Sequence, residues 1–129
     1  MAKSSRGPSV GIVTVAYRSN RVLAGFLDSV AGASAIRPAL VIVDNAPGTD
    51  DASALSAAHG GDYIALPSNP GYGSAVNAGV RALPPSVEWV LISNPDVELG
   101  AGAIDALRMT AESDPTIGAV GPGVLNRPL

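Results

Sequence analysis

The chain has 129 residues, of which 47% are hydrophobic and 15% are charged. Its length fits one domain with its own core, and so apolar a composition excludes an intrinsically disordered chain. Eight basic residues oppose 11 acidic ones, so the formal net charge is −3 and we expect no nucleic-acid partner. The lack of cysteine excludes disulfides, thiolate catalysis, zinc fingers and iron–sulfur clusters.

The apolar stretches have the length of strands, whereas a membrane span needs about 20 residues, so no transmembrane segment is expected. The polar N-terminus does not resemble a secretory signal, which predicts a cytoplasmic protein, either free or peripheral at the inner face of the membrane. The composition along the chain predicts a flexible head over residues 1–9, one domain over residues 10–125 and a truncated tail over residues 126–129.

In chain order, the first predicted element is a strand over residues 10–16, which is apolar on both faces as in a covered parallel sheet. Asn20 is a favoured N-cap, and apolar residues at helical spacing then predict a helix that ends near Gly32. A second apolar strand over residues 40–43 ends at Asp44, and a short helix is expected over about 51–58.

The second half of the sequence repeats this alternation of strands and helices. A short strand is predicted over residues 62–66, a helix from Ser74 to Leu83, a strand over 88–93, a helix over about 102–112 and a fifth strand over 117–121. This order predicts an α/β fold with a mostly parallel sheet, helices on both faces and right-handed crossovers.

Polar residues follow each of the first four predicted strands. In open α/β sheets, ligands bind beyond the carboxyl ends of the strands, so we expect these residues to surround one cavity. The polar clusters are Tyr17-Arg18-Ser19, Asp44-Asn45, Asn69-Pro70-Gly71-Tyr72-Gly73 and Asn94-Pro95-Asp96. The central geometric expectation is that Tyr17, Asp44, Asn69 and Asp96 meet at one end of the sheet.

The two aspartates in these clusters have a structural and a functional interpretation. Asp44 either caps a turn or accepts hydrogen bonds from a nucleotide base or ribose. Asp96 either belongs to an Asn-Pro-Asp turn or holds Mg²⁺ or Mn²⁺ against a diphosphate, since such ions need only one or two protein carboxylates. Glu98 would align with Asp96 only if the chain stays extended.

The glycine-rich segment from Gly71 to Gly79 matches a dinucleotide-binding loop poorly, because Val76 replaces the third glycine and the loop follows the third strand. Its glycines still allow a close backbone approach to a ligand. Tyr17 either stacks on a base or caps the sheet. His59 has no nearby partner at ligand spacing, so it is interpreted as a surface residue.

In this order, the clusters resemble glycosyltransferase family 2, the inverting enzymes of the GT-A fold, and within it the rhamnosyltransferase-like branch. The resemblance covers about residues 10–125 and corresponds to the N-terminal, donor-binding half of such an enzyme. The motifs that carry it are Val13-Thr14-Val15-Ala16-Tyr17, Val43-Asp44-Asn45-Ala46, Asn69-Pro70-Gly71-Tyr72-Gly73 with Asn77 and Gly79, and Asn94-Pro95-Asp96-Val97.

The resemblance implies a Rossmann-like half-domain that binds a nucleotide-diphospho-sugar together with Mg²⁺ or Mn²⁺. Tyr17 would lie against the base, Asp44 would bond its pyrimidine, and Asp96 would bind the metal. The other implied donor-binding residues are Ala16, Asn45, Asn69, Gly71, Tyr72, Gly73, Asn77 and Asn94. Ala16 and Arg18 depart from the family's usual Thr and Asn.

The implied reaction transfers a sugar, such as rhamnose from a dTDP- or UDP-sugar, to a glycan or lipid-linked acceptor in cell-wall or surface polysaccharide synthesis. No candidate for the catalytic base is found in the sequence, so the catalytic residues stay unknown. We therefore expect an incomplete enzyme that pairs with itself or with a missing C-terminal half. The alternatives are a non-catalytic nucleotide-binding or interaction domain, a dinucleotide-dependent oxidoreductase and a nucleotidyltransferase.

Overall fold

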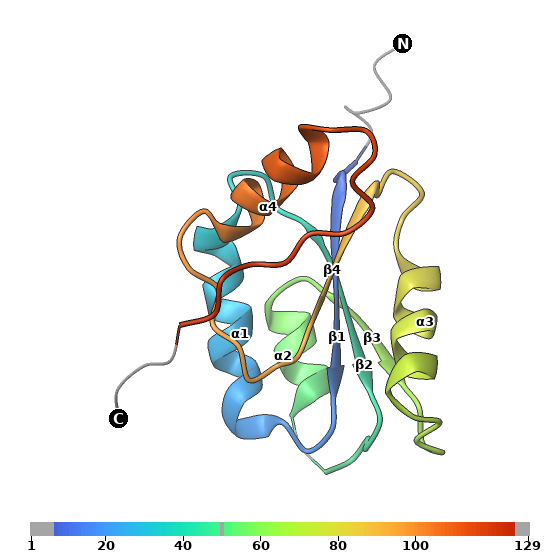
Figure 1. Cartoon of the computed structure of the whole chain (residues 1–129). Coiled ribbons are helices and arrows are strands. Elements are labelled where there is room, and N and C mark those ends of the chain that lie inside the picture. Colours follow the sequence, from blue (N-terminus) through green and yellow to red (C-terminus); the bar gives the residue numbers. More distant parts are fainter. Residues whose placement is uncertain (1–6, 50, 126–129) are drawn as a thin grey trace.

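A four-stranded parallel sheet organises the chain (Figure 1). The computed structural model describes residues 7–49 and 51–125. The strands are β1 (Val10–Ala16), β2 (Ala39–Asp44), β3 (Asp62–Ala65) and β4 (Trp89–Ser93), in the spatial order β3-β2-β1-β4. All three pairings are parallel, so the carboxyl ends of the strands meet at one edge, the lower edge in Figure 1.

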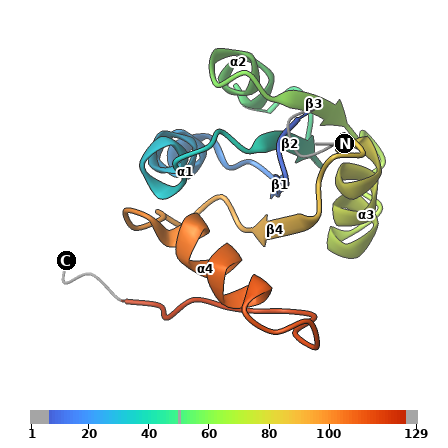
Figure 2. The same cartoon turned by 90° about the horizontal axis from the view of Figure 1, so that it is seen from above.

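Helices cover both faces of this sheet. They are α1 (Asn20–Ala33), α2 (Ala52–Ala58), α3 (Tyr72–Ala82) and α4 (Ala103–Glu112). Seen along the strands in Figure 2, α3 lies on one side of the sheet and α1 on the other. The predicted α/β class, with a parallel sheet and helices on both faces, is confirmed.

The core forms two layers because alternate residues of a strand point to opposite faces. On one face, Ile12 of β1 belongs to the same cluster as Phe26 of α1 and Ile104 of α4. On the other face, Val13 belongs to a smaller cluster that includes Val76 of α3. Every residue of β1 is buried, as expected for a central strand with a neighbour on each side.

Gly79 lets α3 approach the sheet closely. A Cβ added there would lie 2.5 Å from Cγ1 of Val13 and 3.0 Å from Cγ2 of Val43, which is closer than van der Waals contact permits. The glycine that the resemblance included in a donor-binding segment therefore has a packing role of its own between α3 and two strands.

Two predicted helix starts differ from the observed ones. Ser19, rather than Asn20, is at the N-cap of α1, where its carbonyl accepts hydrogen bonds from the backbone of Val22 and Leu23. Helix α3 begins at Tyr72 instead of Ser74, because Gly71 turns the chain with φ +102° and its carbonyl already accepts a bond from Ala75.

The fifth strand predicted over residues 117–121 is wrong. This segment pairs with none of the strands in the described residues. A turn precedes it, in which Asp114 accepts hydrogen bonds from the backbone and hydroxyl of Thr116. Ile117 and Val120 are only half-buried, so the segment lacks the buried face that would have fixed it in the sheet.

The predicted N-terminal head is described only in part. Residues 1–6 lie outside the described residues, as does the predicted tail over 126–129. Pro8 and Ser9 extend β1 toward the start of β4, since their carbonyls accept bonds from the hydroxyl of Ser86 and from the backbone of Glu88.

Candidate functional site

An open hollow of about 510 Å³ lies at the carboxyl edge of the sheet, and we call it the rim hollow. It is lined by Val15, Tyr17, Arg18, Ser19, Val22, Asn45, Asn69, Tyr72, Asn94, Pro95 and Asp96. These residues come from the end of β1, from the loops after all four strands and from the first turns of α1 and α3. The hollow therefore lies where open parallel sheets bind their ligands.

The structure brings together only part of the predicted site. Six of the predicted residues line the rim hollow: Tyr17, Asn45, Asn69, Tyr72, Asn94 and Asp96. Five do not line it: Ala16 and Asp44, which are buried, and Gly71, Gly73 and Asn77, which are exposed on the loop and first turns of α3. Of the four side chains expected around one cavity, Tyr17, Asn69 and Asp96 share it.

A tight turn fixes the loop after β1. The backbone N–H of Tyr17 donates to Oγ of Ser19 at 3.0 Å, and Arg18 between them has φ +52°. A non-glycine residue in the left-handed region is uncommon, and such residues cluster at functional sites. The Tyr17 ring, which is half-exposed, thereby lies at the rim hollow with the Arg18 guanidinium 5.4 Å from its centre.

The loop before α3 has the same kind of backbone. Asn69 has φ +47°, which asparagine tolerates better than most residues, and its N–H donates to the carbonyl of Leu66. Gly71 then takes φ +102° at the N-cap of α3. The backbone conformation at these two positions turns the chain so that Asn69 and Tyr72 both line the rim hollow.

Asp44 lies behind the hollow as a buried anchor. Its carboxyl group accepts a hydrogen bond from the hydroxyl of Tyr63 at 2.7 Å and another from the backbone N–H of Ala46 at 2.9 Å. These contacts tie the end of β2 to the side chain of Tyr63 on β3 and to the turn at Ala46. Sequence reasoning did not identify Tyr63, because a half-buried tyrosine in a short strand gives no signal of its polar partner.

Asn45 is the buried residue that connects Asp44 to the hollow. Its N–H donates to the carbonyl of Ala16 at 2.8 Å, which joins the loops after β1 and β2. Its side chain lines the rim hollow, yet its Oδ1 is buried with no hydrogen-bond partner in the described structure. An unpaired buried acceptor lowers the stability of a fold, so the position of this amide is not explained by fold stability alone.

Asp96 offers the donor set that a hard divalent cation prefers. It is exposed, lines the rim hollow next to Asn94, and has no hydrogen bond or ion pair with another described residue. Within the described ranges, no group of three or more acidic, histidine or cysteine side chains forms a complete cation site. One carboxylate fits Mg²⁺ or Mn²⁺ where phosphate oxygens and water supply the remaining ligands. Glu98 lies beside Gly25 of α1 and does not line the hollow.

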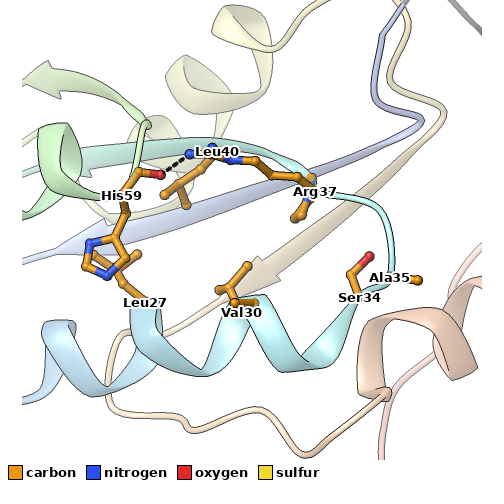
Figure 3. A pocket seen from close by; sticks show the side chains of 9 residues that line it. Leu27, Val30, Ser34, Ala35, Arg37, Leu40 and His59 are labelled. Carbon is orange, nitrogen blue, oxygen red and sulfur yellow. Dashed lines mark hydrogen bonds between the residues drawn. The ribbon is translucent and has the colours of Figure 1, made fainter.

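A second hollow, of about 360 Å³, lies at the opposite end of β2, between α1 and the end of α2 (Figure 3). Leu27, Val30 and Leu40 give it an apolar wall, and Arg37 spans it by donating to the carbonyl of His59 at 2.6 Å. The interpretation of His59 as a surface residue agrees with its partial exposure. Its ring also has two partners, since Nδ1 contacts the carbonyl of Leu55 and Nε2 contacts Asp28 at 3.0 Å.

The Asp28–His59 ion pair makes stability depend on pH. The hydrogen bond to Asp28, and then the one to the carbonyl of Leu55, raise the pKa of His59 above 6.5, while burial and the nearby Arg37 oppose the shift. The stabilisation is therefore complete below pH 6.5 and is lost as pH rises through the pKa of the folded protein. We expect a lower Tm at pH 8 than at pH 6, measured by circular dichroism.

Because His59 is the only histidine, two variants isolate its contribution. Asp28→Asn should reduce the dependence of Tm on pH, and His59→Gln should remove most of it between pH 6 and 8. A dependence that is unchanged in His59→Gln would contradict the assignment.

No helix within residues 7–49 and 51–125 is both long and apolar enough to cross a bilayer.

Comparison with known proteins gives one family and one fold. The model of the family "Glycosyl transferase family 2" matches residues 11–126. The chain is 35% identical to N-acetylglucosaminyl-diphospho-decaprenol L-rhamnosyltransferase of Mycobacterium tuberculosis over 122 residues, which cover 86% of this chain and 39% of that protein. The chain thus spans about two fifths of the length of this curated relative.

Solved structures share the fold at low sequence identity. Residues 1–349 of Staphylococcus aureus TarS superpose with a TM-score of 0.71 at 17% identity, covering 81% of this chain and 32% of that one. A further TarS structure, in complex with UDP, superposes with a TM-score of 0.66 at 19% identity and covers the same shares of the two chains. Glucosyl-3-phosphoglycerate synthase of M. tuberculosis, in complex with Mn²⁺, UDP and glucosyl-3-phosphoglycerate, superposes with a TM-score of 0.62 at 17% identity. This match covers 90% of this chain and 42% of that one. The predicted GT-A architecture is confirmed by these likenesses.

Proposed function

The chain belongs to glycosyltransferase family 2, and from this premise we propose that its rim hollow binds the nucleoside-diphosphate sugar from which the enzyme transfers a sugar. The single observation that carries the proposal is the composition of the rim hollow. Two aromatic rings, three asparagines and one carboxylate line the same space at the carboxyl edge of a parallel sheet.

The parts of a nucleotide-sugar find complementary groups there. The half-exposed Tyr17 ring offers a stacking surface for a base, and the amides of Asn45, Asn69 and Asn94 offer hydrogen bonds to the ribose, base or sugar. Asp44 is proposed to act from behind, either through a remaining acceptor position toward the base or by holding Asn45 in place. The UDP complexes of two structural neighbours support this class of ligand.

Asp96 is proposed to hold a divalent cation, Mg²⁺ or Mn²⁺, against the diphosphate. When bound, such an ion offsets the negative charge that develops on the leaving nucleoside diphosphate. The Mn²⁺ present in the complex of glucosyl-3-phosphoglycerate synthase is consistent with this role. Asp96 and Asn94, on the loop after β4, orient this end of the donor.

The proposal for the substrates of the whole protein draws on the matched relative. That relative is named for the transfer of L-rhamnose to a lipid-linked diphospho-sugar, so we propose dTDP-rhamnose or a UDP-sugar as donor and a glycan or lipid-linked sugar as acceptor. This implies polysaccharide assembly at the cytoplasmic face of a membrane. Inverting transfer needs a general base on the acceptor hydroxyl, and no residue of the rim hollow is assigned that role.

The proposal predicts that nucleotide binding depends on the metal and on Asp96. Binding of UDP or dTDP to the chain is measured by titration calorimetry with and without Mn²⁺. Mn²⁺ should strengthen this binding at least about tenfold, since direct ligation of the diphosphate by the metal contributes more than about 1.4 kcal/mol. Asp96→Asn should abolish this strengthening.

The matched control is Glu98→Gln, which removes a carboxylate two residues away that does not line the hollow. Its binding should equal that of the unmodified chain. Failure of the unmodified chain to bind either nucleotide with Mn²⁺ would favour a non-catalytic interaction domain, and binding of NADH without metal would favour an oxidoreductase.

A further inference from the structure

Arg18 is a charged residue of the rim hollow to which neither the family pattern nor the predicted site assigns a role. It is the only cationic side chain among the described residues that line the hollow, and Asp96 is the only anionic one. The guanidinium lies 5.4 Å from the centre of the Tyr17 ring. No hydrogen bond or ion pair joins it to another described residue, so its five N–H donors are available to a ligand.

The backbone holds Arg18 at the hollow at a cost. Its φ of +52° is unfavourable for a long side chain, and a glycine or an asparagine would adopt this conformation more readily. The hydrogen bond from the Tyr17 N–H to Oγ of Ser19 and the start of α1 at Asn20 keep the turn in this form. The loop therefore keeps an arginine where backbone energetics favour other residues, which points to a use for its charge.

Charge balance indicates what that use is. The diphosphate of a nucleotide-sugar carries two negative charges near neutral pH, and Asp96 adds a third. A divalent cation at Asp96 leaves one negative charge in excess, and one guanidinium cancels it. A planar guanidinium is also suited to bind two phosphate oxygens at once.

We propose that Arg18 binds the diphosphate of the donor, with the Tyr17 ring holding its guanidinium in place by a cation–π contact. The inference rests on the proposed function and extends it by adding a donor-binding residue at a position where the family usually has Asn. Arg18 and the metal at Asp96 approach the diphosphate as two separate positive groups. Part of the affinity for nucleoside diphosphates should therefore persist when the metal is removed.

The test compares UDP with uridine, which shares the base and ribose but lacks the phosphates. Arg18→Asn is the main variant, because asparagine tolerates the left-handed backbone and so removes the charge without disturbing the turn. Binding of each ligand is measured by calorimetry with EDTA and with Mn²⁺. Arg21→Gln, on the exposed surface of α1 and outside the hollow, is the matched control.

We expect Arg18→Asn to weaken UDP binding about tenfold in both conditions and to leave uridine binding unchanged. Arg18→Lys, which keeps the charge but loses the planar guanidinium, should retain only part of the UDP affinity, and Arg21→Gln should retain all of it. Equal UDP affinity of Arg18→Asn and the unmodified chain, or an equal loss for uridine and UDP, would overturn the inference while leaving the proposed function intact. If the unmodified chain binds no UDP, both proposals fail.

Discussion

Replacing Gly79 with alanine is expected to lower the free energy of unfolding by about 2 kcal/mol, as overpacking of a close helix–sheet contact does. The new Cβ would lie 2.5 Å from Cγ1 of Val13 and 3.0 Å from Cγ2 of Val43. Both valines are fully buried on central strands, so neither can move without disturbing the sheet. Urea unfolding followed by circular dichroism measures the effect.

Gly73→Ala is the matched control, because Gly73 lies on the same helix and a Cβ there would meet nothing within 4 Å. Helix propensity favours alanine over glycine by up to about 1 kcal/mol, so this variant should be neutral or more stable. If both alanine variants were equally stable, the packing role of Gly79 would be wrong. A loss of nucleotide binding in Gly79→Ala would follow from displacement of α3, whose first residue, Tyr72, lines the rim hollow.

Asp44→Ala is expected to lower the free energy of unfolding by about 3 kcal/mol. The substitution leaves the Tyr63 hydroxyl and the Ala46 N–H without their acceptor and opens a small cavity at the end of β2. Tyr63→Phe removes only one of these bonds and should cost about 1 kcal/mol. Chemical unfolding of the two variants and of their double mutant measures both bonds and their coupling.

Asp62→Ala serves as the control, since Asp62 is an exposed carboxylate at the start of β3 and should change stability little. The double mutant should be less destabilised than the sum of the single variants, because both remove the same hydrogen bond. Strict additivity would show that the Asp44–Tyr63 bond does not contribute. If Tyr63→Phe keeps its affinity for UDP while Asp44→Ala loses it, Asp44 acts on the ligand beyond its structural role.

The order of the elements could be predicted from the sequence because the apolar segments of this chain are sharply bounded. The strand over residues 10–16 has the predicted limits, and polar residues that follow each strand stop it where the sheet ends. The error at residues 117–121 has the opposite cause. That segment has strand-like composition, but a strand also needs a neighbour and a buried face, and these depend on the tertiary structure.

The rim hollow was predictable to the extent that topology alone brings residues together. The parallel sheet places Tyr17, Asn69 and Asp96 at one edge, as their positions after strands indicate. The sequence could not show which of two adjacent residues, Asp44 or Asn45, faces the hollow. That choice depends on the Tyr63 hydroxyl, which holds Asp44 inside the fold. The left-handed backbone of Arg18 could not be predicted either, because arginine has no preference for that conformation.

The pairing of β1 with β4 has a consequence for the biogenesis of the protein. Of the described strands, β1 is synthesised first; it lies inside the sheet, and one of its two neighbours starts only at Trp89. Until that partner is synthesised, a largely apolar strand keeps one row of backbone groups unpaired, and such edges invite association with other chains. Nascent chains that have not reached β4 should therefore depend on chaperones.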